Sequence, residues 1–188
     1  MMMRMLEAGG LEILSDEVRR PDQDNPAGYY ESERVKHLKD GDDGWLESAR
    51  GRGVKVVSPL LQHLPSRYSY KVIFMTRTMS EILASQQQML VRVGHGTESA
   101  SDDIVAAAFA RHLRTVEAWL GHQPNIEALY VNYGHVLERP RRSVLAINAF
   151  LGDRLVPEAM LEVIDPSLYR QKAAPIRDAK PEGVDGIK

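Results

Sequence analysis

Four short apolar runs, separated by helical or turn-rich segments, limit the folds open to this chain more than any other feature. They are LEIL at 11–14, VKVVS at 54–58, KVIFMT at 71–76 and ALYVN at 128–132. Their β-branched and aromatic content is typical of strands. Strands that alternate with helices indicate βαβ units. We therefore predict an α/β fold in which helices flank a parallel sheet in three layers.

Helices are predicted between and around these strands. The expected segments are 1–8, 30–40, 44–50, 101–121 and 141–151. In the fourth segment, apolar residues recur at helical spacing, which predicts a face in the core. These residues are Ile104, Val105, Ala108, Phe109, Leu113, Val116, Trp119 and Leu120. We assign residues 1–170 to one domain and residues 171–188, which hold few large apolar groups, to a mobile C-terminal tail.

The charge and cysteine content exclude several classes of function. The 188 residues include 24 basic and 26 acidic side chains, a formal net charge of −2, so no strong electrostatic signature for nucleic acid is present. No apolar run approaches the roughly 18 residues of a membrane span, and we expect no membrane partner. The absence of cysteine excludes disulfides and a cysteine nucleophile, and it is compatible with a reducing compartment. We expect a cytoplasmic protein.

The six histidines give no sign of a metal site. No two of them stand four residues apart, the spacing that places two imidazoles on one helix face, and no flanking carboxylates complete a ligand set. We predict no bound metal.

Arg77 and Ser85 are the strongest candidate for a binding site. Arg77 follows the apolar run at 71–76, at the turn where ligands of open α/β sheets bind. Thr78 and Glu81 form a capping-box pattern for a helix, and seven helical residues turn Ser85 to within about 20° of Thr78. A guanidinium, a hydroxyl and a helix N-terminus together suit a phosphate. The alternative is an exposed arginine beside an ordinary helical serine.

The segment 55–85 resembles the sulfotransferases that use 3′-phosphoadenosine 5′-phosphosulfate. In the cytosolic branch, a strand ending in Lys-Thr-His-Leu-Pro precedes a Leu-Pro turn, an apolar strand with an arginine, and a serine eight residues later. The matching positions here are Lys55, Pro59, Leu64, Pro65, the run at 72–75, Arg77 and Ser85. The resemblance implies a sulfotransferase-like fold of the P-loop type, with Arg77 and Ser85 holding the 3′-phosphate of the nucleotide.

Three further stretches extend the resemblance over about residues 1–170. MMMRMLEAGG at 1–10 is similar to the helix after the family's phosphate-binding loop, and NPAGYYE at 25–31 looks like an acceptor-side segment of bacterial members. LYVNYGHVLERP at 129–140 resembles the start of the family's Tyr-Glu-Asp-Leu helix. The family's first strand and its Pro-Arg-Ser-Gly-Thr loop belong before Met1. We expect a truncated chain or a start codon assigned too late, and an inactive protein if the loop is absent.

The catalytic base is a second departure from the family, because Val57 stands where the family has histidine. Other branches use a carboxylate, and the candidates here are Asp16, Glu17 and Glu31. The alternative for each of them, which exposed acidic residues favour, is a surface or capping carboxylate. Lys55 is the candidate for stabilising charge on the transferring group or the leaving phosphate, and its alternative is a lysine at a strand edge.

Three functions remain open from the sequence. The first is a sulfotransferase that moves a sulfuryl group from 3′-phosphoadenosine 5′-phosphosulfate to a hydroxyl or amine of a small molecule or protein, with no metal required. The second is a nucleotide kinase or other NTPase, for which LEILSD offers the one aspartate directly after a strand. The third is a truncated, non-catalytic binding domain, whose exposed strand edges favour association into homo-oligomers.

Overall fold

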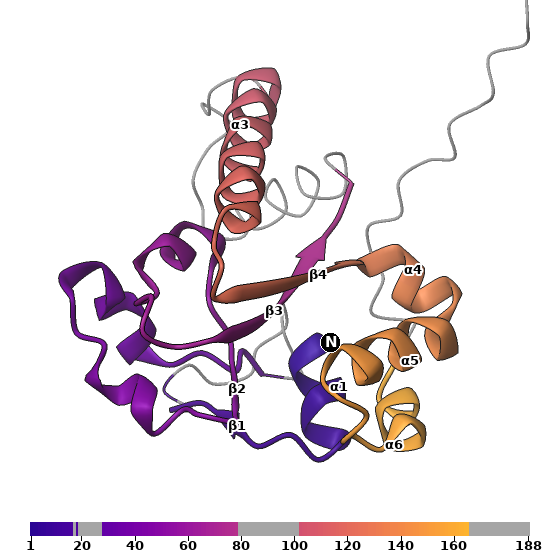
Figure 1. The fold of residues 1–188 in the computed structure, drawn as a ribbon. Coiled ribbons are helices and arrows are strands. Elements are labelled where there is room, and N and C mark those ends of the chain that lie inside the picture. Colours follow the sequence, from indigo (N-terminus) through magenta and orange to yellow (C-terminus); the bar gives the residue numbers. More distant parts are fainter. Residues whose placement is uncertain (17, 19–27, 79–101, 166–188) are drawn as a thin grey trace, which may run out of the picture.

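The computed structural model describes residues 1–16, 18, 28–78 and 102–165, which form a mixed α/β fold with short parallel sheets and surrounding helices (Figure 1). The strands are β1 (Ile13–Leu14), β2 (Gly53–Val54), β3 (Tyr70–Thr76) and β4 (Ile126–Asn132). The α-helices are α1 (Met2–Ala8), α3 (Asp102–Gly121), α4 (Tyr133–Glu138), α5 (Pro140–Phe150) and α6 (Pro157–Glu162). The 3₁₀ helices are η1 (Glu33–Asp40), η2 (Gly44–Glu47) and η3 (Ser58–His63).

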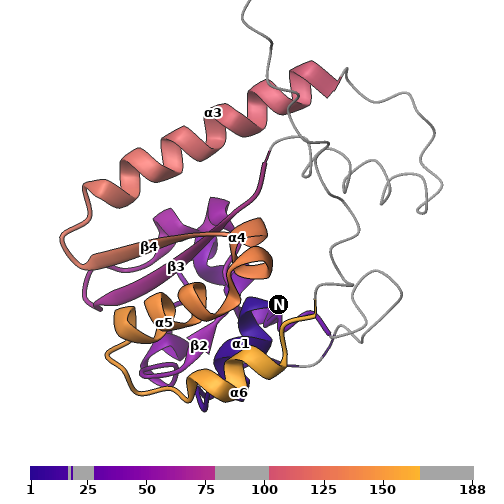
Figure 2. The same cartoon turned by 90° about the vertical axis from the view of Figure 1, so that its right-hand side faces the viewer.

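The longer sheet consists of β3 and β4, which run parallel over seven positions, from Tyr70 opposite Ile126 to Thr76 opposite Asn132. Both of its faces are covered. Figure 2 shows α3 on one side and α1, α5 and α6 on the other. Phe74 packs in a cluster with Val116 and Leu120 of α3. Around this pair of strands the predicted three layers are present, and the continuous apolar run of β3 reflects burial on both faces.

The shorter sheet consists of β1 and β2, which pair at two positions. The Gly53 N–H donates to the Glu12 carbonyl across 2.8 Å. The strand predicted at 54–58 is shorter in the structure, where β2 ends at Val54 and η3 begins at Ser58 with Pro59 in its first turn. Proline lacks the N–H that a strand ladder requires and its fixed φ suits the start of a helix.

The prediction of parallel α/β architecture is confirmed, but the four strands lie in two separate pairs instead of one sheet. Two segments predicted as short helices form the 3₁₀ helices η1 and η2, and two short helices, η3 and α6, were not predicted. Ile104 is 63% exposed, so the apolar stripe of α3 reaches the core near the C-terminal end of the helix, at Val116 and Leu120.

Most of the fully buried side chains belong to the core formed by the helices below the β3–β4 sheet. Met5, Val136, Val144, Ile147 and Met160 are all inaccessible to solvent. They come from α1, α4, α5 and α6, and they pack against Leu129 and Val131 of β4 in one cluster. A second, smaller cluster lies around β1 and β2. It comprises Val35, Leu38, Trp45, Leu46 and Ala49.

The described helices show no membrane-spanning candidate. None of them combines the length and the apolar composition that crossing a bilayer requires.

Candidate functional site

The residues that follow β2, β3 and β4 line one cavity of about 1100 Å³. Lys55 follows β2, Arg77 follows β3, and Tyr133 follows β4 as the first residue of α4. Ligands of open α/β sheets bind outside the carboxyl ends of the strands, because side chains from several strands converge there. This edge is therefore the candidate site.

Arg77 is held by an aromatic ring. Its Cζ lies 3.8 Å from the centroid of the Tyr133 ring, and Tyr133 is buried. Tyr133 is itself fixed at the start of α4, where the Asn132 side chain accepts a hydrogen bond from the His135 N–H at 3.1 Å. A guanidinium stacked on a ring keeps its in-plane N–H donors available for an anion. Stacking on Tyr133 thus orients Arg77 without occupying those donors.

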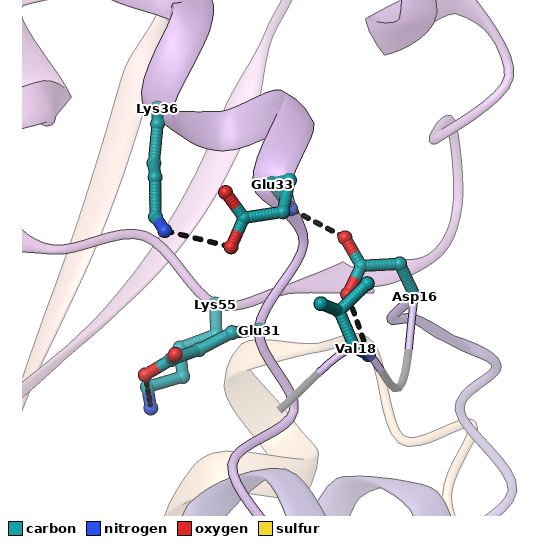
Figure 3. Close-up of polar contacts among 6 residues, drawn as sticks. All are labelled: Asp16, Val18, Glu31, Glu33, Lys36 and Lys55. Carbon is teal, nitrogen blue, oxygen red and sulfur yellow. Dashed lines mark hydrogen bonds and ion pairs between the residues drawn. The ribbon is translucent and has the colours of Figure 1, made fainter. Parts of the chain in front are cut away.

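Lys55 lies beside Glu31, as Figure 3 shows, and also contacts the backbone of Tyr29. Its Nζ donates to the Tyr29 carbonyl at 2.9 Å and to Glu31 Oε1 at 3.0 Å, and both side chains of the ion pair are about one-third exposed. The structure therefore joins two sequence-predicted site residues, Lys55 and Glu31. The Glu31 carboxylate balances the charge of Lys55.

The Asp16 carboxylate caps the backbone at the start of η1. It accepts hydrogen bonds from the N–H groups of Glu33 and Val18, as Figure 3 shows. Those bonds, led by the one from Glu33, lower the pKa of Asp16 below its usual range. A general base works best with a pKa near the working pH. The contacts of Asp16 therefore correspond to the capping alternative, and they favour Glu31 as the carboxylate beside Lys55.

Positive charge gathers around the start of α1. Burial lowers the pKa of the Met1 amino group, and the charges of Arg4, Arg77 and Lys55 lower it further. Because charge effects of this kind fall off with distance, these three cations lie near Met1, which lines the cavity. Two of these cations, Arg77 and Lys55, also line the cavity, and Glu31 pairs with Lys55.

Tyr30 connects the segment at 28–31 to α1. Its hydroxyl donates to Glu7 Oε2 at 2.6 Å, and burial together with this bond raises the pKa of Tyr30 to about 12. Tyr30 also adopts a φ of 52°, in the left-handed region. The tyrosine therefore holds a strained turn against α1, beside the ion pair of Lys55 and Glu31.

A contact between Ser58 and His112 has no signal in the sequence. Ser58 Oγ lies 2.9 Å from His112 Nε2, and both residues are half-buried. A serine and a histidine at this distance are also the arrangement of a nucleophile and its general base, which a third group usually orients. Among the described residues, however, no carboxylate accepts a hydrogen bond from His112 to orient it. The contact joins η3 to α3 across 54 residues, a separation at which no spacing rule predicts pairing.

Two predicted site residues, Glu17 and Ser85, lie outside the described residues, as does the proposed C-terminal tail. Within the described ranges, no three histidine or acidic side chains form a group that could hold a metal ion. Comparison of the chain with protein-family models, with curated proteins and with solved structures finds no match.

Proposed function

We propose that this chain is a sulfotransferase-like nucleotide-binding domain in which Arg77 binds the 3′-phosphate of 3′-phosphoadenosine 5′-phosphosulfate. The observation that supports the proposal most directly is the placement of Arg77. It follows β3, lies against Tyr133 and lines a cavity that also contains Lys55. An oriented arginine at the carboxyl end of a parallel strand is suited to a phosphate dianion.

The chemistry proposed for this site is sulfuryl transfer. The hydroxyl oxygen or amine nitrogen of the acceptor forms a bond to sulfur while the bond from sulfur to the 5′-phosphate oxygen breaks, and adenosine 3′,5′-bisphosphate leaves. Glu31 accepts the proton that the acceptor loses, and Lys55 balances the charge that develops on the leaving phosphate. Their ion pair at 3.0 Å supports this division of roles, because either group can exchange its partner for a ligand.

The first experiment is calorimetric titration of the protein with adenosine 3′,5′-bisphosphate. We expect binding that Arg77→Ala weakens by about tenfold to a hundredfold, since charge-assisted hydrogen bonds to one phosphate are lost. The matched control is Arg114→Ala, which removes an exposed arginine from α3, away from the cavity. Equal loss in both variants, or no binding by the unaltered protein, contradicts the proposal.

The second experiment separates transfer from binding. We expect Glu31→Gln to abolish transfer of labelled sulfate from the donor while the affinity for the bisphosphate changes little, because the amide cannot accept the proton. Binding without any transfer supports the non-catalytic alternative. Magnesium-dependent ATP turnover with no response to the bisphosphate favours the nucleotide kinase alternative.

A further inference from the structure

A serine and a histidine meet where η3 packs on α3. Ser58 Oγ lies 2.9 Å from His112 Nε2, within hydrogen-bond distance. Ser58 is the first residue of η3 and is followed by Pro59, whose ring fixes its own backbone φ, and His112 lies in the middle of the 20-residue α3. Both side chains therefore come from helical elements, which position reacting groups more precisely than loops do.

The packing of η3 on α3 holds this contact in place. Leu61 of η3 is 5% exposed and belongs to one buried cluster with Val116 of α3. Phe109 lies three residues before His112 on the same helix, and the centroids of their two rings are 6.4 Å apart. These contacts limit the positions that the imidazole can adopt beside the Ser58 hydroxyl.

Ser58 lines the cavity, whereas His112 stands outside the lining. A molecule in the cavity can therefore reach the serine hydroxyl, while the imidazole contacts that hydroxyl from the protein side. Both residues are half-buried, so the pair is partly shielded from bulk water. A serine nucleophile and its general base require this arrangement, in which the base lies within hydrogen-bond reach and leaves the approach to the hydroxyl open.

Apolar side chains form the cavity wall beside Ser58. Val56 precedes it, Leu61 follows it on η3, and Phe109 and Leu113 come from α3. Val56 and Leu113 pack against the same buried cluster as Leu61. Apolar walls favour an uncharged ligand with aliphatic or aromatic groups, because a charge placed against them would lose solvation. An apolar ester is the ligand class that fits both this wall and a nucleophilic serine.

We propose that Ser58 and His112 form a nucleophilic pair that cleaves apolar esters, an activity separate from sulfuryl transfer. Ser58 Oγ forms a bond to the carbonyl carbon of the ester while His112 Nε2 accepts the hydroxyl proton. The bond from that carbon to the alcohol oxygen breaks, and the alcohol leaves with the proton from His112. Water then displaces Ser58 from the acyl group, its proton passes through His112 to the serine oxygen, and the acid is released.

The first test is labelling with an alkyl fluorophosphonate, in which Ser58 Oγ bonds to phosphorus and fluoride leaves. We expect mass spectrometry to show one added phosphonyl group, on the peptide that contains Ser58, and we expect the protein to hydrolyse p-nitrophenyl butyrate. His112→Gln keeps a hydrogen-bonding side chain but no base, and it should slow both reactions by about a hundredfold. The matched control is Ser69→Ala, which removes another serine that lines the cavity and should react as the unaltered protein does.

The second test uses the absence of cysteine from the chain. Ser58→Cys introduces a single thiol, and a base at His112 makes that thiol a better nucleophile by taking its proton. We expect iodoacetamide at about pH 7 to alkylate Ser58→Cys at least about tenfold faster than Ser58→Cys combined with His112→Gln. A hydrogen bond with a purely structural role would not produce this difference. As the control, adding His112→Gln to Ser69→Cys should leave the alkylation rate unchanged.

Three outcomes would overturn the proposal. The first is an unaltered protein that neither reacts with the fluorophosphonate nor hydrolyses the ester. The second is labelling that His112→Gln leaves unchanged. The third is equal alkylation of Ser58→Cys with and without His112→Gln, which would leave the contact as a structural hydrogen bond between η3 and α3. The proposal uses neither Arg77 nor Glu31, so bisphosphate binding and ester cleavage can fail separately.

Discussion

The two strand pairs of this protein show how differently parallel pairing can be stabilised. β3 and β4 pair over seven positions, and successive side chains of β3 alternate between two apolar clusters, with Phe74 facing α3 and Ile73 facing the helical core. β1 and β2 pair at two positions and lie against a cluster of five buried residues. A register shift of one residue would exchange the two faces of β3, so the side chains of the long pair fix its register. The register of the short pair depends instead on the elements packed around it.

The largest effect is expected at the long pair. Phe74 is 7% exposed, and its ring centroid lies 5.6 Å from that of Tyr130 on β4. Phe74→Ala should lower the free energy of unfolding by about 3 to 5 kcal/mol, because it leaves a cavity between the sheet and α3. Urea denaturation measures this loss. Val156→Ala, at an exposed site, is the control, and a loss at Phe74 no larger than at Val156 would contradict the importance of the long pair.

A smaller effect is expected at the short pair. A Cβ atom at Gly53 would lie 2.6 Å from Ile13 Cδ1, so the two strands approach closely at this glycine. Gly53→Val should cost about 1 to 3 kcal/mol through overpacking, with Ile13 absorbing part of the strain by changing rotamer. Gly44→Val is the matched control, since nothing lies within 4 Å of a Cβ there. Equal urea midpoints for the two variants would show that β1 and β2 do not pack this tightly.

A still smaller effect is expected from the cap beside the short pair. Asp16→Ala removes the acceptor for the N–H groups of Glu33 and Val18, so its urea midpoint at neutral pH should fall by less than that of Gly53→Val. The pKa of Asp16 is lowered in the folded protein, so its contribution is present above the unfolded value and disappears as the pH falls below about 4. Asp16→Asn, which keeps an acceptor oxygen, should retain most of the stability. A deficit in Asp16→Ala that persists unchanged at low pH would contradict this assignment.

The smallest effects are expected at two tyrosines, Tyr70 at the start of β3 in the long pair and Tyr30 near the short pair. Burial is the first cause that raises the pKa of both Tyr30 and Tyr70 to about 12, and their hydroxyls donate to Glu7 and to the Pro65 carbonyl. Above pH about 10, the unfolded chain loses these protons while the folded protein keeps them. Stability is therefore fully present below pH 10 and falls as the pH rises toward 12.

Tyr30→Phe and Tyr70→Phe each remove one of these two protons, so each should flatten the alkaline loss of stability in urea midpoints measured from pH 9 to 12. The two variants serve as controls for each other. A profile identical to that of the unaltered protein in both would contradict the assignment of the loss to these hydroxyls.

The sequence predicts the long elements well. The apolar run at 71–76 and the run at 128–132 are strands within two residues of their predicted bounds, and the helix predicted at 101–121 begins one residue later. These segments are long enough for periodic burial to dominate local preference. The short segments are predicted less well, because a 3₁₀ turn such as η1 or η2 has the composition of a short α-helix.

The candidate site was predicted in part. Arg77 could be found because its position after an apolar strand is visible in the sequence, yet the ring that orients it, Tyr133, lies 56 residues away. The pairing of Lys55 with Glu31 and the capping contacts of Asp16 likewise depend on chain segments that meet through folding. Sequence spacing carries information about neighbours within an element, and these contacts cross between elements.

By itself, the sequence determined the local chemistry of this protein: the runs that become β3 and β4, the apolar stripe of α3 and the arginine placed after a strand. Hydrophobic periodicity and turn chemistry act over a few residues, so they can be read directly. Tertiary structure decided how the strands are grouped. Among the described residues the four strands form two pairs, and the long-range contacts that group strands in this way leave no periodic trace in the chain.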